Sequence, residues 1–161
     1  MNECWNFFRY ASKDEIEEII SLAKKNKVWF SHLKKSHFID KIEKKECIYE
    51  NGVLITFRIV NFKTKLGSYT VNIGNTILEQ IIKNQEKSNS NLVKHVFLKF
   101  INCAPGSVYL AVNKRNLRAI KFYSNMNMKR ISETILDYKD DDDTYVKGYI
   151  FKTNTINLKI N

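Results

Sequence analysis

The chain has 161 residues, the length of one compact domain, and 43% of them are apolar, which is enough for a hydrophobic core. These values exclude a wholly disordered chain. Lys and Arg number 27 against 17 Asp and Glu, so the net charge is +10. No stretch reaches the roughly 18 apolar residues of a membrane helix, and the start, Met1–Trp5, does not resemble a signal peptide. We expect a single domain over residues 1–161, cytoplasmic, with no membrane partner, as a monomer or homodimer.

The positive charge has two interpretations. Abundant Lys, Asn and Ile with a single Pro are typical of an AT-rich genome, and then the charge needs no partner. Alternatively it attracts an anion, such as nucleic acid, a phosphorylated cofactor or an acidic protein. Five Asp and one Lys give Asp137–Asp143 a charge of −4, which leaves +14 for the rest. This segment matches the first seven residues of a common epitope tag, and both an inserted tag and a native acidic loop fit it.

The cysteines and histidines predict no metal site and no disulfide framework. The three cysteines are odd in number, form no CxxC pair and favour a reducing compartment, with Cys47 and Cys103 as small core residues. The histidines, His32, His37 and His95, lack ligand spacing.

The first half of the chain predicts a strand, two helices and a hairpin. The aromatic run Trp5–Tyr10 favours a strand. Ser12 and Glu15 form a capping box that starts a helix over 13–25, with apolar residues at helical spacing. A second helix is expected over 28–44, with these residues inward: Trp29, Phe30, Leu33, Phe38 and Ile42. Asn51-Gly52 is typical of a tight hairpin turn between strands at 47–49 and 53–60.

The second half predicts helices and strands in alternation. A further strand is expected to end near Tyr69–Val71. A third helix is expected over 75–87, because Ile77, Leu78, Ile81 and Ile82 recur at helical spacing. A helix over 92–102, a strand at 108–112, a helix over 115–125 and strands at 129–136 and 144–152 follow. This order predicts a mixed α/β domain.

One segment carries the functional inference. Residues 108–130 read VYLAVNKRNLRAIKFYSNMNMKR: a buried strand, a helix with Asn116 and Tyr123, then a turn and a strand. The segment closely resembles the C-terminal motif of the GNAT acyltransferase family, and the order of elements resembles that family over nearly the whole chain. The resemblance implies a mixed, mostly antiparallel central sheet flanked by helices, and an N-acetyltransferase that uses acetyl-CoA as co-substrate without a metal.

The resemblance also implies site residues. Tyr123 matches the family's general acid, Asn116 matches the asparagine that contacts the CoA chain, and the backbone at Val112 and Asn113 matches the segment along the pantetheine arm. A tyrosine with an ordinary pKa near 10 stays protonated at neutral pH and suits that acid.

The family's phosphate-binding loop, Arg/Gln-x-x-Gly-x-Gly/Ala, has a weaker counterpart at Tyr69–Gly74. Gly74 keeps the second glycine, Asn72 replaces the first and Tyr69 replaces Arg/Gln. Free N–H groups at the start of the expected 75–87 helix would bind the pyrophosphate. The expected binding residues are Val71, Asn72, Ile73, Gly74, Asn75 and Thr76.

No general base is evident, because residues 61–70 contain no Asp or Glu. The leading hypothesis is transfer of acetyl from acetyl-CoA to a primary amine. The acceptor is a small amine, a protein amine or an amine on a polyanion such as an aminoacyl-tRNA or modified DNA base. The alternatives are a binding or regulatory module on a degenerate fold of this kind and a basic nucleic-acid-binding protein without catalysis.

Overall fold

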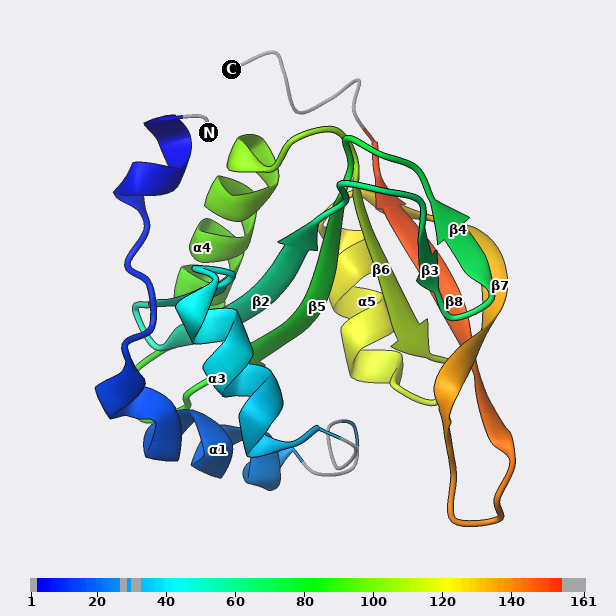
Figure 1. Cartoon of the computed structure of the whole chain (residues 1–161), viewed down its shortest axis with the longest axis horizontal. Coiled ribbons are helices and arrows are strands. Elements are labelled where there is room, and N and C mark those ends of the chain that lie inside the picture. Colours follow the sequence, from blue (N-terminus) through cyan, green and yellow to red (C-terminus); the bar gives the residue numbers. More distant parts are fainter. Residues whose placement is uncertain (1–2, 27–28, 30–32, 155–161) are drawn as a thin grey trace. The chain divides into compact units, whose positions relative to one another are not determined.

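A computed structural model describes residues 3–26, 29 and 33–154 (Figure 1). The chain divides into two compact units. The first unit runs to Arg58 and resumes at Leu78–Cys103, and the second contains Ile59–Ile77 and the chain from Ala104. Strand β5 (Thr76–Lys83) contributes residues to both units.

The first unit contains the strands β1 (Cys47–Glu50) and β2 (Val53–Ile59), followed by β5, in the order β1-β2-β5. The predicted hairpin turn is confirmed: β1 and β2 pair antiparallel, and Asn51 and Gly52 have φ values of 50° and 72°. Only glycine and a few polar residues adopt such values readily, which explains why this pair occupies the turn.

Helices cover both faces of the first unit's strands. Helix α1 (Ile16–Lys25) follows a 3-10 turn at Lys13–Glu15, and the Ser12 capping box is present as predicted. Together with α3 (Lys35–Glu43), α1 packs on the face that shows Leu54. Helix α4 (Ser90–Cys103) lies on the opposite face, where Phe100 contacts Phe57 of β2 with 5.2 Å between ring centroids. The second predicted helix, 28–44, is confirmed only from Lys35 to Glu43, because residues 33 and 34 are not helical. Phe38 and Ile42 are buried as predicted, Leu33 is half-buried, and Phe30 and His32 lie outside the described residues.

The predicted strand at Trp5–Tyr10 is wrong. Glu3–Phe7 forms a 3-10 helix, and only Tyr10 makes an isolated bridge, to Ile48. Trp5 is buried, and its ring stacks on Phe57 at 4.9 Å. Phe8 is buried as well, so Trp5 and Phe8 pack on the core, whereas Phe7 is exposed.

The predicted helix over 75–87 is also wrong, because residues 76–83 form strand β5. Most of its side chains are buried, on both faces of the strand. A strand that is apolar on both faces shows no alternation, so its pattern resembles that of a buried helix.

A disulfide between Cys4 and Cys103 corrects the expectation of reduced cysteines. The Cα atoms are 5.6 Å apart, within the usual range for a disulfide, and the two residues are 99 positions apart in sequence. Lys99 Nζ also donates to the Phe7 carbonyl at 2.6 Å. The N-terminal segment is therefore attached to α4 by a covalent bond and a hydrogen bond. Cys47 is buried as predicted, and burial raises the pKa of its thiol to about 12.

We expect reduction of this disulfide to lower the free energy of unfolding by about 2–4 kcal/mol, because the bond restricts a long loop of the unfolded chain. Thermal denaturation with and without dithiothreitol measures the change. The double variant Cys4→Ala/Cys103→Ala is expected to show no dependence on the reductant. Three reactive thiols in the unfolded, unreduced protein, instead of the one from Cys47, would contradict the pairing.

The second unit contains β6 (Val108–Asn113), β7 (Met128–Lys139) and β8 (Tyr145–Thr153) in the order β5-β6-β8-β7. β6 and β7 both pair antiparallel with β8, whereas Thr76 and Ile77 of β5 pair parallel with β6. A separate hairpin joins β3 (Thr64–Leu66) and β4 (Tyr69–Val71). Helix α5 (Leu117–Asn125) lies between β6 and β7 in the chain. The predicted elements from residue 92 onward are confirmed within a few residues.

Candidate functional site

Tyr123 lies on α5 in the second unit, with 8% of its surface exposed. Its ring lies 6.0 Å from that of Phe151 on β8 and 5.6 Å from that of Phe122. Burial raises the pKa of the Tyr123 hydroxyl above its usual value of 10. The group is therefore protonated throughout the neutral range, as a proton donor must be.

Asn116 is the N-cap of α5. Its Oδ1 accepts a hydrogen bond from the Ala119 N–H at 3.2 Å, and its carbonyl accepts from the Ile120 N–H at 3.0 Å. The side chain of Asn116 therefore starts the helix that carries Tyr123. The sequence motif implies a second role for Asn116, a contact with CoA, in addition to this capping role.

The two roles of Asn116 predict different phenotypes. Asn116→Ala is expected to cost about 1 kcal/mol of stability, because the cap is lost. Asn116→Ser keeps a capping oxygen, so its stability is expected to stay within a few tenths of a kcal/mol of the wild type. A raised Kd for acetyl-CoA in the Ser variant, measured by titration calorimetry, would then report the lost ligand contact. An unchanged Kd would assign the residue to capping alone.

Val112 and Asn113 lie at the end of β6. β6 pairs with β8 along its length but with β5 only through Val108 and Tyr109. Within the second unit as described, no strand pairs with the other edge of β6 from Leu110 to Asn113. Such an edge presents backbone N–H and C=O groups to an extended ligand. Asn113 Oδ1 also accepts from the Arg115 N–H at 2.9 Å, which fixes the turn into α5.

The residues expected to bind pyrophosphate, 71–76, are the end of β4, a turn at 72–75 and the first residue of β5. The helix start on which that expectation depends is therefore not present at this position. Gly74 has a φ of 90°, and its N–H donates to the Val60 carbonyl at 3.0 Å. The Thr76 N–H donates to Ser107, and Asn75 Oδ1 accepts from the Ser107 N–H. Neither the Gly74 nor the Thr76 amide is free for an anion, and the element that follows is strand β5, not the start of a helix. The other members are the buried Val71 and the exposed Asn72 and Ile73.

A loop that does lead from a strand into a helix lies at residues 84–89 of the first unit, before α4. Asn89 caps α4 by accepting from the Leu92 N–H at 3.0 Å. The first turn of α4 contains no acidic residue. Ser88 Oγ is buried and has no hydrogen-bond partner among the described residues. An orphaned hydroxyl beside a helix start fits an anion that accepts its hydrogen bond.

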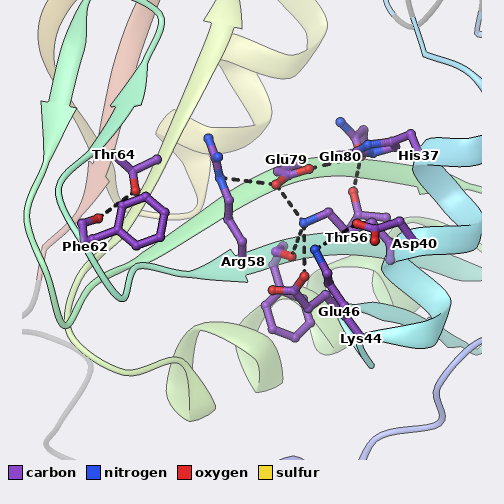
Figure 2. A network of polar contacts seen from close by, with 12 residues as sticks. His37, Asp40, Lys44, Glu46, Thr56, Arg58, Phe62, Thr64, Glu79 and Gln80 are labelled. Atoms are coloured by element: carbon purple, nitrogen blue, oxygen red, sulfur yellow. Dashed lines mark hydrogen bonds and ion pairs between the residues drawn. The ribbon is translucent and has the colours of Figure 1, made fainter.

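Figure 2 shows a polar network in the first unit that sequence analysis missed. Its centre is Glu79 of β5: Lys41 Nζ of α3 lies 2.9 Å from Glu79 Oε1, and Arg58 Nε of β2 lies 3.3 Å from the same oxygen. His37 Nε2 lies 3.7 Å from Glu79 Oε2 and 3.1 Å from Gln80 Oε1. The network joins three segments that are distant in sequence, so no local spacing could have revealed it. Recognising 76–83 as a strand would have drawn attention to Glu79 as its one carboxylate.

Among the described residues, no group of three His, Cys, Asp or Glu side chains gathers as a metal site would require. In the same part of the chain, no helix is long and apolar enough to cross a membrane.

Neither a family model nor a curated protein matches this sequence. Solved structures do match it in fold. A GNAT-family acetyltransferase from Streptococcus agalactiae aligns with a TM-score of 0.68 at 10% identity, over 91% of this chain and 93% of that one. Chaetomium thermophilum Naa20, bound to a bisubstrate analogue, gives 0.67 at 11% identity over 90% and 84%. Arabidopsis thaliana NAA60, bound to acetyl-CoA, gives 0.63 at 12% identity over 90% and 96%. The chain therefore has the GNAT fold, a mixed α/β architecture with a mostly antiparallel sheet flanked by helices.

Proposed function

We propose that the protein is an N-acetyltransferase that moves an acetyl group from acetyl-CoA directly to a primary amine. The observation that carries the proposal is Tyr123, a buried and protonated tyrosine on a helix capped by Asn116, within the GNAT fold. The acceptor nitrogen attacks the thioester carbonyl and forms the C–N bond of the amide. The C–S bond breaks, Tyr123 donates its proton to the departing thiolate, and a base takes a proton from the amine.

We assign the contacts with acetyl-CoA separately in each unit. In the second unit, the edge of β6 at Val112 and Asn113 offers backbone partners to the two amides of the pantetheine arm, beside Asn116. In the first unit, the N–H groups of Ser90 and Asn91 and the Ser88 hydroxyl offer donors to the pyrophosphate. The start of α4 supports this assignment better than residues 71–76 do, because a helix follows only there.

We propose Glu79 as the base. The strand that precedes the phosphate-binding loop commonly bears such a carboxylate in proteins with the resembling motif, and β5 bears Glu79. Lys41 and Arg58 hold its carboxylate in place, and the side chain is 15% exposed.

The net positive charge of the chain favours one class of acceptor over another. A net charge of +10 repels polycationic amines and attracts an amine attached to a polyanion, such as a nucleic acid or an aminoacyl-tRNA. Use of acetyl-CoA, an intracellular metabolite, supports the cytoplasm as the location. The Cys4–Cys103 disulfide is the observation that stands against it, because cytosolic thiols are kept reduced.

Titration calorimetry with acetyl-CoA tests the proposal, and two matched charge variants test the pyrophosphate assignment. Ser90→Glu places a carboxylate at the start of α4, where it favours the helix but repels a pyrophosphate. Asn72→Glu places the same charge in the exposed loop 71–76. We expect micromolar binding that Ser90→Glu abolishes and Asn72→Glu leaves within twofold.

Loss of binding in Asn72→Glu but not in Ser90→Glu would assign the pyrophosphate site to residues 71–76. No binding at millimolar acetyl-CoA would overturn the enzyme proposal. Binding of nucleic acid that acetyl-CoA does not affect would then favour a basic binding protein on a degenerate GNAT fold.

A further inference from the structure

The second unit has a one-sided charge composition. Outside Asp137–Asp143, its residues include 11 Lys and Arg but a single acidic residue, Glu133. The first unit, by contrast, contains 15 basic and 11 acidic residues. Outside Asp137–Asp143 the second unit therefore carries +10 against +4 for the first unit, and with that segment included it carries +6.

Two of these cations, Lys114 and Arg130, lie over the ring of Tyr149 of β8, and Lys147 is two residues before it on the same strand. We call Lys114, Arg130, Lys147 and Tyr149 the Tyr149 cluster. Arg130 Cζ lies 4.4 Å and Lys114 Nζ 5.1 Å from the centre of the Tyr149 ring. The Lys114 N–H donates to the Lys147 carbonyl at 3.1 Å. The ring and this backbone bond hold cations from β7, β8 and the β6–α5 connection close together.

The cluster continues onto α5. Successive residues of a strand point to opposite faces, so Lys147, Tyr149 and Phe151 share one face of β8. Phe151 contacts Tyr123 of α5, which places the helix on that same face. The exposed cations of the helix and its connection are Arg115, Arg118 and Lys121. Within the described residues, no carboxylate lies within ion-pair distance of any of these three side chains.

Glu133 is the one carboxylate at the cluster. Its Oε1 lies 2.8 Å from Lys114 Nζ, and its side chain is 72% exposed. The Lys114 ammonium group holds the pKa of Glu133 below its usual value. Glu133 is therefore ionised at neutral pH and competes with any anion that approaches Lys114.

We propose that the Tyr149 cluster and the basic side of α5 bind the phosphate backbone of a tRNA, and that the acceptor is the amine of its aminoacyl ester. A row of cations that far outnumber the carboxylates beside them, here Glu133 alone, is typical of nucleic-acid-binding surfaces. The inference rests on the proposed acetyl transfer for its choice of tRNA. Attack on a thioester needs an available nitrogen lone pair, which the aliphatic amine of an aminoacyl ester has and the conjugated amino groups of bases lack.

Fluorescence anisotropy with uncharged tRNA, without acetyl-CoA, tests the surface. The variant Arg130→Gln/Lys147→Gln is expected to weaken binding at least tenfold and to reduce the salt slope of log K by about 1.8, since each lost phosphate contact contributes about 0.9. The control Lys24→Gln/Lys25→Gln removes two exposed cations from α1 and is expected to change Kd less than twofold. Glu133→Gln is expected to tighten binding two- to threefold.

Equal weakening by the cluster variant and the control would overturn the inference, because it would indicate unspecific attraction. Displacement of tRNA by an equally charged poly-glutamate would overturn it in favour of an acidic protein. Acetylation of peptides or small amines without tRNA binding would overturn the inference and leave the proposed function intact. Binding of tRNA without binding of acetyl-CoA would overturn the proposed function and keep the surface.

Discussion

Replacing Tyr123 by Phe is expected to lower kcat about 100- to 1,000-fold and to leave the affinity for acetyl-CoA within twofold. The substitution removes only the hydroxyl group, and a positioned general acid contributes a factor of this size. A rate assay that follows thiol release at saturating acetyl-CoA gives kcat, and calorimetry gives the affinity. The matched control is Tyr69→Phe on β4, which removes a hydroxyl from the same unit outside the proposed site.

The raised pKa of Tyr123 also determines how kcat depends on pH under alkaline conditions. An acid acts only while protonated, so a pKa above 10 keeps the donor active across the whole range in which the protein is assayed. We expect no decline of kcat up to about pH 9.5 that is attributable to this group. A decline near pH 8, or an unchanged kcat in Tyr123→Phe, would assign the proton to another donor.

Lys41→Ala is expected to lower the free energy of unfolding by about 3–5 kcal/mol, the cost of leaving buried charge without its partner. The Lys41 side chain is 7% exposed, and its ammonium group donates to the Phe57 carbonyl at 2.8 Å and to Glu79 at 2.9 Å. Without Lys41, the negative charge of Glu79 has one cation fewer to neutralise it. The Phe57 carbonyl also loses the hydrogen bond that Lys41 donates. Denaturant titration followed by circular dichroism measures the loss.

Lys44 provides the control, because it is the C-cap residue of α3 and is 61% exposed in its pair with Asp40. Exposed pairs contribute little, so Lys44→Ala is expected to cost no more than about 0.5 kcal/mol. The double variant Lys41→Met/Glu79→Gln removes both charges and is expected to recover much of the loss. Similar costs for Lys41→Ala and Lys44→Ala would show that the network contributes nothing to stability.

The elements that short sequence motifs predict are confirmed where a motif depends only on neighbouring residues. The Asn51-Gly52 turn and the Ser12 capping box lie where their residue types predict them, because each requires only neighbours in the chain. The helix and strands predicted for the segment from β6 to β8 are also confirmed, and this segment contains Tyr123 and Asn116.

The errors arose where the structure depends on distant parts of the chain. Burial on both faces of β5 removes the alternation that marks a strand, so the sequence predicts a helix at 75–87 and a phosphate-binding loop in front of it, where the structure has a strand. Glu79 was missed for the same reason. The Cys4–Cys103 pair is separated by 99 positions, and no spacing rule predicts such a pairing.

The interleaving of the two units along the chain determines an order of events during synthesis. The first unit has all its residues once Cys103 has left the ribosome, and only then can Cys4 find its partner. Residues 59–77 emerge earlier but belong to the second unit. Their apolar side chains, Val60, Val71 and Ile77, pack with Tyr109 of β6. A nascent chain that pauses before β6 has Leu66 and Tyr69 to pack against these side chains but lacks Tyr109, so the cluster is only partly covered at this stage and is open to a chaperone.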